Sequence, residues 1–205
     1  MKAPVPVAVL VSGGGTNLQA LLDAGARGEI RHGKIALVLS DRKGAYALER
    51  AKKANIPALA FDRKELGLEA VEAAFKSALE EHGIKIIVLA GFLSILSSDF
   101  IRQYEGRILN VHPSLIPAFC GPGFYGLKVH EAALSRGVKL TGATVHLVNE
   151  EADGGPILQQ KAVKVLPSDT PQTLQKRVME EAEWVILPQC VEELCMNYYE
   201  GKELR

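Results

Sequence analysis

Short apolar runs alternate with amphipathic segments along the first half of the chain. Five of these runs predict strands, and all but the last are apolar at almost every position, which is typical of strands buried on both faces of a sheet. They span residues 7–11, 35–39, 58–61, 84–90 and 107–112. Apolar residues at helical spacing predict a helix after each of the first four runs. Three of these helices span Thr16 to Gly25, about 45 to 54, and 95 to 104, and the long helix after the third run ends at Gly83.

The pattern changes after residue 112. Residues 113–126 contain three prolines, three glycines and three aromatic residues without periodicity, which predicts a long loop of the kind that often carries function. A helix is predicted over 128–136 and two strands over 141–148 and 157–165. A helix capped by Thr170 begins at Pro171 and runs towards Pro188, and a last helical stretch reaches about residue 199.

Alternating strands and helices predict βαβ units with right-handed crossovers. We found no repeat, low-complexity segment or linker. The expected fold class is therefore α/β: a single Rossmann-like domain over residues 1–205, with a mostly parallel sheet and helices on both faces.

Composition and charge narrow the class of protein further. Of 205 residues, 47% are hydrophobic and 23% are charged, which is ordinary for a soluble globular chain. Lys plus Arg and Asp plus Glu both number 24, so bulk charge does not favour nucleic acid or an anionic membrane. No apolar run is long enough for a membrane span. Three cysteines without paired spacing are typical of reduced thiols in a cytoplasmic protein. The five histidines show no metal-ligand spacing, so we predict no metal.

A glycine-rich segment, Ser12 to Asn17, connects the first strand to its helix. Its glycines permit a tight turn and a close approach to a ligand, and the helix start offers free N–H groups. The spacing is neither that of a dinucleotide site nor that of a P-loop, which favours a phosphate monoester on a small molecule. A turn that binds nothing is the alternative. Thr16 with Gln19 also predicts a capping box.

Asn110 and His112 lie two residues apart at the end of the fifth predicted strand. They therefore point to the same side, at the carboxyl edge where ligands of open α/β sheets bind. An amide donor beside an imidazole can stabilise an oxyanion and transfer a proton. A His-Pro pair in isolation is more often structural.

Asp153 precedes two glycines and so occupies a tight turn. An ionised carboxylate close to His112 would favour the imidazolium form. A plain Asp-Gly turn is the alternative unless the fold brings the two side chains together. His130 and His146 either line a pocket or are satisfied within the fold.

These features resemble the folate-dependent formyltransferases, and among them the glycinamide ribonucleotide formyltransferases. The resemblance extends from Val7 to about Pro188. The segments that carry it are Ser12 to Asn17, Val88 to Phe92, Leu109 to Leu115, Gly126 to His130 and Asp153 to Pro156.

The resemblance implies that the chain transfers a formyl group from 10-formyltetrahydrofolate to the amine of glycinamide ribonucleotide, in purine biosynthesis. It implies that Asn110 stabilises the oxyanion and contacts the formyl group. His112 would be the general acid, and Asp153 the carboxylate that favours its protonated form. The residues implied for the ribonucleotide phosphate are Gly15, Thr16 and Asn17. Those implied for the folate are Lys64, Leu93, Ser94, Ile95, Leu96 and Asn110.

The same resemblance implies no permanently bound cofactor, since 10-formyltetrahydrofolate is a cosubstrate. The expected partners are the two small-molecule substrates, with no nucleic acid and no membrane. The expected oligomeric state is a monomer or a homodimer.

Two positions depart from the pattern of the resembled family. Ser94 stands where many relatives carry an arginine, so any folate contact from that guanidinium is missing. In the penultimate helix, relatives have Gln-Glu-His, whose Glu is implied to bind the substrate amine. Here the stretch is Glu181-Ala182-Glu183, with Ala at the Glu position. The choice between Glu181 and Glu183 for that role stays open, as does any role for Cys120 in the long loop.

Two other enzymes of the same family and a non-catalytic binding module are the alternatives. A methionyl-tRNA formyltransferase is expected to add a basic C-terminal domain, and a formyltetrahydrofolate hydrolase an N-terminal regulatory domain. A folate- or nucleotide-binding module without catalytic activity would be favoured if Asn110, His112 or Asp153 were missing, and all three are present.

Overall fold

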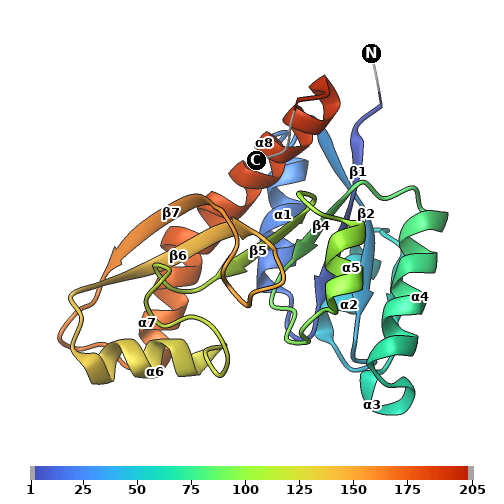
Figure 1. The fold of residues 1–205 in the computed structure, drawn as a ribbon. Coiled ribbons are helices and arrows are strands. Elements are labelled where there is room, and N and C mark those ends of the chain that lie inside the picture. The colour runs from blue at the N-terminus through green and yellow to red at the C-terminus, as the bar shows by residue number, and fades with distance from the viewer. Residues whose placement is uncertain (1–2, 203–205) are drawn as a thin grey trace.

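Seven strands form one sheet in the order β3-β2-β1-β4-β5-β6-β7 (Figure 1). The computed structural model describes residues 3–202. The strands are β1 (Val5–Val11), β2 (Gly33–Ser40), β3 (Ala58–Ala60), β4 (Ile86–Leu89), β5 (Ile108–His112), β6 (Leu140–Leu147) and β7 (Ile157–Lys164). Strands β1 to β5 are parallel, whereas β6 runs antiparallel to β5, and β7 to β6. The predicted α/β class with a mostly parallel sheet is confirmed.

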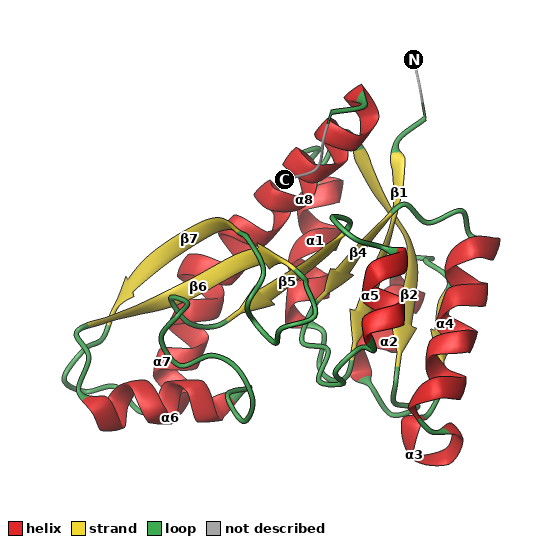
Figure 2. Cartoon of the chain, viewed as in Figure 1, coloured by secondary structure: helices red, strands yellow, loops and turns green. Residues whose placement is uncertain are grey.

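Helices cover both faces of this sheet (Figure 2). They are α1 (Thr16–Ala26), α2 (Tyr46–Lys53), α3 (Arg63–Leu66), α4 (Leu68–Glu81), α5 (Ser98–Gln103), α6 (Leu127–Arg136), α7 (Pro171–Val178), a π-helical turn η1 (Met179–Glu183) and α8 (Trp184–Glu200). The short helix α3 was not predicted.

Strand β1 shows why the core has two halves. Val7 and Val9 pack with α1 and α8 in one buried cluster, whereas Ala8 and Leu10 pack with α4 and α5 in the other. Successive side chains of a strand point to opposite faces, so an entirely apolar strand can serve both clusters.

The C-terminal helical region differs from the prediction of two helices separated near Pro188. Helix α7, the turn η1 and helix α8 follow one another without a break, and Pro188 lies inside α8. Proline removes one helical hydrogen bond. Leu187, Pro188, Cys190 and Val191 are all buried against the sheet, and that packing offsets the loss.

The predicted capping box at Thr16 and Gln19 is wrong. Helix α1 begins one position earlier than that motif requires, with Gly15 as the N-cap in the left-handed region at φ 72° and no side-chain cap. The Gln19 side chain instead donates to Asp23. The box at the start of α7, between Thr170 and Thr173, does form.

The order of the strands determines where a ligand can bind. The chain passes from β1 through β2 to β3 on one side, then crosses to β4 on the other side of β1. The loops after β1 and β4 therefore separate at this point and leave a crevice at the carboxyl ends of the strands. Two hydrogen bonds tie these loops together: Ser12 N donates to Gly91 O (3.1 Å), and Leu93 N donates to Ser12 Oγ (2.9 Å).

The turn between β6 and β7 presses its backbone against the end of β6. A Cβ atom at Gly155 would lie 1.8 Å from the carbonyl oxygen of Leu147, so only glycine fits without moving the turn. Asp153, two residues earlier, has a φ of 57°, a conformation that Asp tolerates better than most residues. The close approach at Gly155 therefore fixes the turn that presents Asp153.

We predict that Gly155→Ala lowers the free energy of unfolding by roughly 3 kcal/mol, because the new Cβ collides with backbone rather than with a movable side chain. Thermal unfolding measures the change. The matched control is Gly25→Ala in α1, where no atom lies within 4 Å of the added Cβ. That variant is expected to be neutral or stabilised by up to about 1 kcal/mol. Equal melting temperatures for both variants would contradict the prediction.

Candidate active site

A cavity of about 840 Å³ opens at the carboxyl ends of β1, β4 and β5. Nearly all of the residues predicted for the site line it, from the loops after β1 and β4, from β5, and from the turn after β6. They are Gly15, Thr16, Asn17, Leu93, Ser94, Ile95, Leu96, Asn110, His112 and Asp153. Lys64 is the exception, since it lines an adjoining cavity described below.

The carboxylate of Asp153 lies at the centre of a polar cluster. Its Oδ1 accepts a hydrogen bond from Asn110 Nδ2 at 3.3 Å, and its Oδ2 accepts one from the backbone N–H of Gly121 at 2.8 Å. His112 Nδ1 is 3.6 Å from Oδ2, and His146 Nε2 is 3.6 Å from Oδ1. The structure thus brings together Asn110, His112 and Asp153, which lie up to 43 positions apart in the sequence.

Asp153 stays ionised in this setting. Burial alone would raise its pKa, but the neighbouring His146 ring, the charge of His112 and the hydrogen bond from Gly121 together lower it below the ordinary value. The cluster therefore presents a negative charge to both imidazoles.

Asn110 is fixed by strand pairing. It lies opposite His146 in the antiparallel pair β5–β6, and its Nδ2 is 3.0 Å from His146 Nε2. His146 Nδ1 in turn is 2.9 Å from the carbonyl oxygen of Leu147, an acceptor, so Nδ1 carries the proton and Nε2 accepts from the amide. The sequence left His146 unassigned, because the β5–β6 register that pairs it with Asn110 is not visible in the residue pattern.

His112 is buried, and an oxygen faces each of its ring nitrogens. Nε2 is 2.9 Å from the carbonyl oxygen of Phe119, and Nδ1 faces Asp153. Only the imidazolium form can donate in both directions. The long loop that contains Phe119 and Gly121 therefore contacts both His112 and Asp153, a contact that the sequence did not indicate.

The glycine-rich loop leads into the first turn of α1 beside this cluster. Gly15 packs against helix α2, where an added Cβ would lie 2.6 Å from that of Ala47. Thr16, Asn17 and Leu18 begin the helix, so their backbone N–H groups have no helical acceptor and suit an anion.

The side chain of Asn17 is not directed to an anion. It is buried and donates from Nδ2 to Glu183 Oε2 at 2.6 Å, while its own Oδ1 has no partner among the described residues.

Glu183 is the carboxylate of the penultimate helical region that reaches the cavity, whereas Glu181 is exposed to solvent. It closes the π-helical turn η1, and a π turn contains one more residue than an α turn. Burial raises the pKa of Glu183 to about 7, an effect that the hydrogen bond from Asn17 only partly opposes. This choice between two carboxylates could not be made from the sequence, because the π turn changes which residues share a face.

His130 on α6 also lines the cavity and is fully buried. Neither ring nitrogen has a partner among residues 3–202. Burial, together with the charge of His112, lowers the pKa of His130 to about 4, so the ring is neutral.

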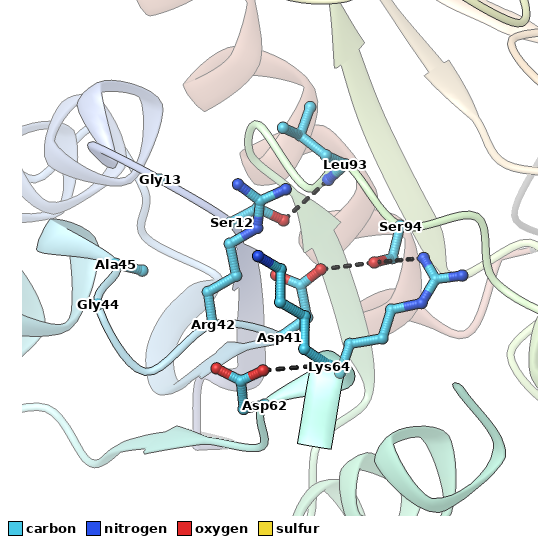
Figure 3. A pocket seen from close by; sticks show the side chains of 11 residues that line it. Ser12, Gly13, Asp41, Arg42, Gly44, Ala45, Asp62, Lys64, Leu93 and Ser94 are labelled. Atoms are coloured by element: carbon cyan, nitrogen blue, oxygen red, sulfur yellow. Dashed lines mark hydrogen bonds between the residues drawn. The ribbon is translucent and has the colours of Figure 1, made fainter. Parts of the chain in front are cut away.

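A second cavity of about 600 Å³, the side cavity, adjoins the first (Figure 3). Gly13, Arg42, Leu93 and Ser94 line both. On its wall, Ser94 Oγ donates to Asp41 Oδ2 at 2.5 Å, and Arg63 Nη1 donates to Ser94 Oγ at 2.9 Å. Lys64 also lines it, and Asp62 Oδ1 accepts from the Lys64 backbone N–H.

Residues 3–202 contain no group of three or more His, Cys, Asp or Glu side chains placed to hold a metal ion. In the same range, no helix has the length and apolar character needed to cross a membrane. The three cysteines are free thiols.

Comparison with known proteins gives the same family from sequence and from structure. The Formyl transferase family model matches residues 5–191. The phosphoribosylglycinamide formyltransferase of Haemophilus influenzae is 42% identical over 184 residues, covering 89% of this chain and 83% of that protein. The trifunctional purine biosynthetic protein adenosine-3 of Gallus gallus is 44% identical over 86% of this chain, but the match spans only 17% of that protein's length.

A solved structure supports the match. The crystal structure of glycinamide ribonucleotide transformylase 1 from Symbiobacterium toebii superimposes with a TM-score of 0.87 at 40% identity, covering 95% of this chain and 89% of that one. From the family model, the relatives and this structure together, the chain belongs to the formyl transferase family.

Proposed function

We propose that the chain, as one domain over residues 1–205, transfers a formyl group from 10-formyltetrahydrofolate to the amine of glycinamide ribonucleotide. The observation that carries this proposal is the convergence of Asn110, His112 and Asp153 in a cavity that also contains the start of α1. The names of the relatives in Haemophilus influenzae and Symbiobacterium toebii support the same substrate. Tetrahydrofolate and formylglycinamide ribonucleotide would be the products.

The ribonucleotide would enter with its phosphate at the first turn of α1, where the N–H groups of Thr16 and Asn17 are free. In this substrate the ribose directly follows the phosphate, and the amine lies at the opposite end. Glu183 is hydrogen-bonded to Asn17 and so lies next to the phosphate site. We therefore assign Glu183 to the ribose hydroxyls, instead of the amine role that the family resemblance implied.

The pterin of the formyl donor would occupy the segment after β4. Leu96 is buried there, whereas Leu93 and Ile95 are exposed and line the cavity with Phe92. An apolar wall next to backbone polar groups suits a flat heterocycle. Ser94 and Lys64 would lie farther along the donor, at the side cavity.

The reaction needs an oxyanion to be stabilised and a proton to be moved. The amine attacks the formyl carbon, a C–N bond forms, and the carbonyl oxygen takes the negative charge. The bond from that carbon to N10 of the folate then breaks, and N10 takes a proton from the His112 imidazolium. Asp153 holds the imidazolium by charge, and the proton that the amine releases as the new amide forms passes to the neutral His112 ring, which regenerates the imidazolium.

Two hydrogen bonds of the site must change during the reaction. Both amide protons of Asn110 are engaged, with His146 and Asp153, and the bond to Asp153 is the longer at 3.3 Å. We infer that this bond is the one exchanged for the oxyanion. His112 Nε2 would likewise leave the Phe119 carbonyl to reach N10.

The direct test is an absorbance assay of the purified protein with 10-formyltetrahydrofolate, in the presence and absence of glycinamide ribonucleotide. Release of deformylated folate that depends on the ribonucleotide supports the proposal. Release without it would indicate a hydrolase of the same fold, and no release in either case would indicate a binding module.

We predict that His112→Ala lowers kcat by about 10²–10⁴-fold, because the leaving nitrogen then lacks its proton donor. Steady-state kinetics with both substrates at saturation measures the loss. The control is His82→Ala at the end of α4. His82 lines neither cavity, so this variant is expected to leave kcat unchanged. A His112→Ala rate within tenfold of the parent would exclude the acid role.

We predict that Glu183→Gln raises KM for glycinamide ribonucleotide by about tenfold, because a hydroxyl donor then meets a neutral amide rather than a carboxylate. Glu181→Gln, two residues away and exposed, is the matched control and is expected to leave KM unchanged. If both variants showed the same KM, the ribose assignment would be wrong.

The same pair of variants yields a pH test that needs no substrate. The pKa of Glu183 rises from 4.5 to about 7 on folding. Between pH 4.5 and about 7 the folded protein therefore keeps a proton on Glu183 that the unfolded chain has lost. Its contribution to stability is present below about pH 4.5 and is lost as the pH rises towards 7. As the pH rises across this window, the melting temperature of Glu183→Gln should therefore increase relative to that of the parent by on the order of 5 °C. The difference between Glu181→Gln and the parent should stay constant.

A further inference from the structure

Helix α2 holds two carbonyl oxygens of the glycine-rich loop on its own side. Ala47, in the first turn of α2, donates its backbone N–H to Gly13 O at 3.0 Å. Arg50, three residues farther along the helix, donates from Nε to Gly14 O at 2.8 Å. The cavity of 840 Å³, here called the main cavity, is lined by the loop but by no residue of α2. Both carbonyls therefore point away from a ligand in the main cavity.

Peptide geometry then sets the direction of two N–H groups. In a trans peptide unit the C=O and N–H bonds point in opposite directions, and both units of this loop are trans. The N–H groups of Gly14 and Gly15 thus point away from α2, and both residues line the main cavity. Neither N–H has a protein acceptor among residues 3–202. Two more donors therefore adjoin the free N–H groups at the start of α1, where we place the phosphate.

The orientation of the peptide unit between Gly14 and Gly15 needs support from outside the loop. Glycine adopts positive and negative φ about equally well, so a Gly-Gly peptide can rotate by half a turn at low cost. The rotated unit would present its carbonyl oxygen to the phosphate and repel it. A hydrogen bond from a guanidinium is charge-assisted and stronger than one between neutral groups. The bond from Arg50 to Gly14 therefore favours the orientation that offers an N–H.

Arg50 is itself fixed in place. Its side chain is half-buried, Nη1 donates to Gln19 Oε1 on α1 at 3.1 Å, and Cζ lies 5.2 Å from the centre of the Tyr46 ring. These contacts restrict the guanidinium before any ligand binds. In the described part of the chain, no carboxylate forms an ion pair with Arg50. Arg50 lines neither cavity, so it acts through Gly14 and not by touching a ligand.

We propose that Arg50 is a positioning residue of the ribonucleotide site, which holds the Gly14 carbonyl and thereby turns the Gly15 N–H towards the substrate phosphate. This rests on the proposed function, since it takes the phosphate of glycinamide ribonucleotide to bind at the start of α1. Loss of Arg50 weakens recognition of the phosphate and leaves the chemical step unchanged.

The experiment compares two acceptors that differ only in the phosphate, glycinamide ribonucleotide and the corresponding ribonucleoside. In Arg50→Gln, KM for the ribonucleotide is expected to rise about tenfold, whereas kcat and the KM for the formyl donor stay at the parent values. The kcat/KM for the ribonucleoside should not change, because this acceptor has no phosphate for the Gly15 N–H to bind. A general disturbance of the loop would instead lower kcat/KM for both acceptors alike.

Lys53→Gln separates the position of Arg50 from its charge. Lys53 lies on the same helix, with Nζ 5.8 Å from the centre of the same Tyr46 ring, and it is exposed to solvent. Its removal takes away one positive charge without touching the Gly14 carbonyl. The KM for the ribonucleotide should therefore stay within about twofold of the parent value, because an exposed charge at this distance is screened.

A binding measurement with inorganic phosphate needs no formyl transfer. In the parent protein, the amide signals of Gly14 and Gly15 in a ¹H–¹⁵N NMR spectrum are expected to shift as phosphate is added. In Arg50→Gln, the Kd from the same titration should be about tenfold higher, and in Lys53→Gln it should match that of the parent.

Three results would overturn the proposal: an unchanged KM for the ribonucleotide in Arg50→Gln, an equal loss with both acceptors, or an equal effect of Lys53→Gln. Amide signals of Gly14 and Gly15 that do not respond to phosphate would overturn it as well. The proposed function fails on a different observation. A parent protein that binds phosphate at these amides, but forms no product that depends on the ribonucleotide, would refute formyl transfer and leave the role of Arg50 in anion binding intact.

Discussion

The return of the chain from β3 to the far side of β1 determines the position of every functional group. This crossing separates the loops after β1 and β4 at the carboxyl edge of the sheet, and the Ser12 hydroxyl and backbone hold the two loops in register. The phosphate site follows β1, the apolar wall follows β4, and Asn110 and His112 end the next strand, β5. A different strand order would scatter the same residues over separate edges.

Much of this arrangement could be predicted from local pattern. The apolar runs of β1 and β4 predicted these strands, and the alternation of strands and helices predicted the parallel sheet. The spacing of Asn110 and His112 predicted that both side chains point to one side. The proximity of Asp153 could be inferred only by resemblance, because it depends on the packing of a turn 41 positions beyond His112. The Gly155 contact with Leu147 that holds this turn is a tertiary close approach, which no periodicity reveals.

Three features of the site lay beyond the sequence for different physical reasons. The pairing of Asn110 with His146 depends on antiparallel register, and register depends on turn geometry. The contact of the long loop with His112 uses a backbone carbonyl, that of Phe119, and a backbone group carries no sequence signal. The burial of Glu183 depends on η1, which interrupts the regular helical spacing on which the prediction relied.

That π turn also affects how this chain should be compared with its relatives. A regular α-helix would need one residue fewer between Thr170 and Glu183 to present a carboxylate at the same place. Aligning the segment without a gap therefore pairs Ala182 with the glutamate that the family resemblance implies, and the carboxylate of Glu183 is then overlooked. Superposition of backbones, with the gap placed at η1, is the comparison that identifies equivalent side chains in this region.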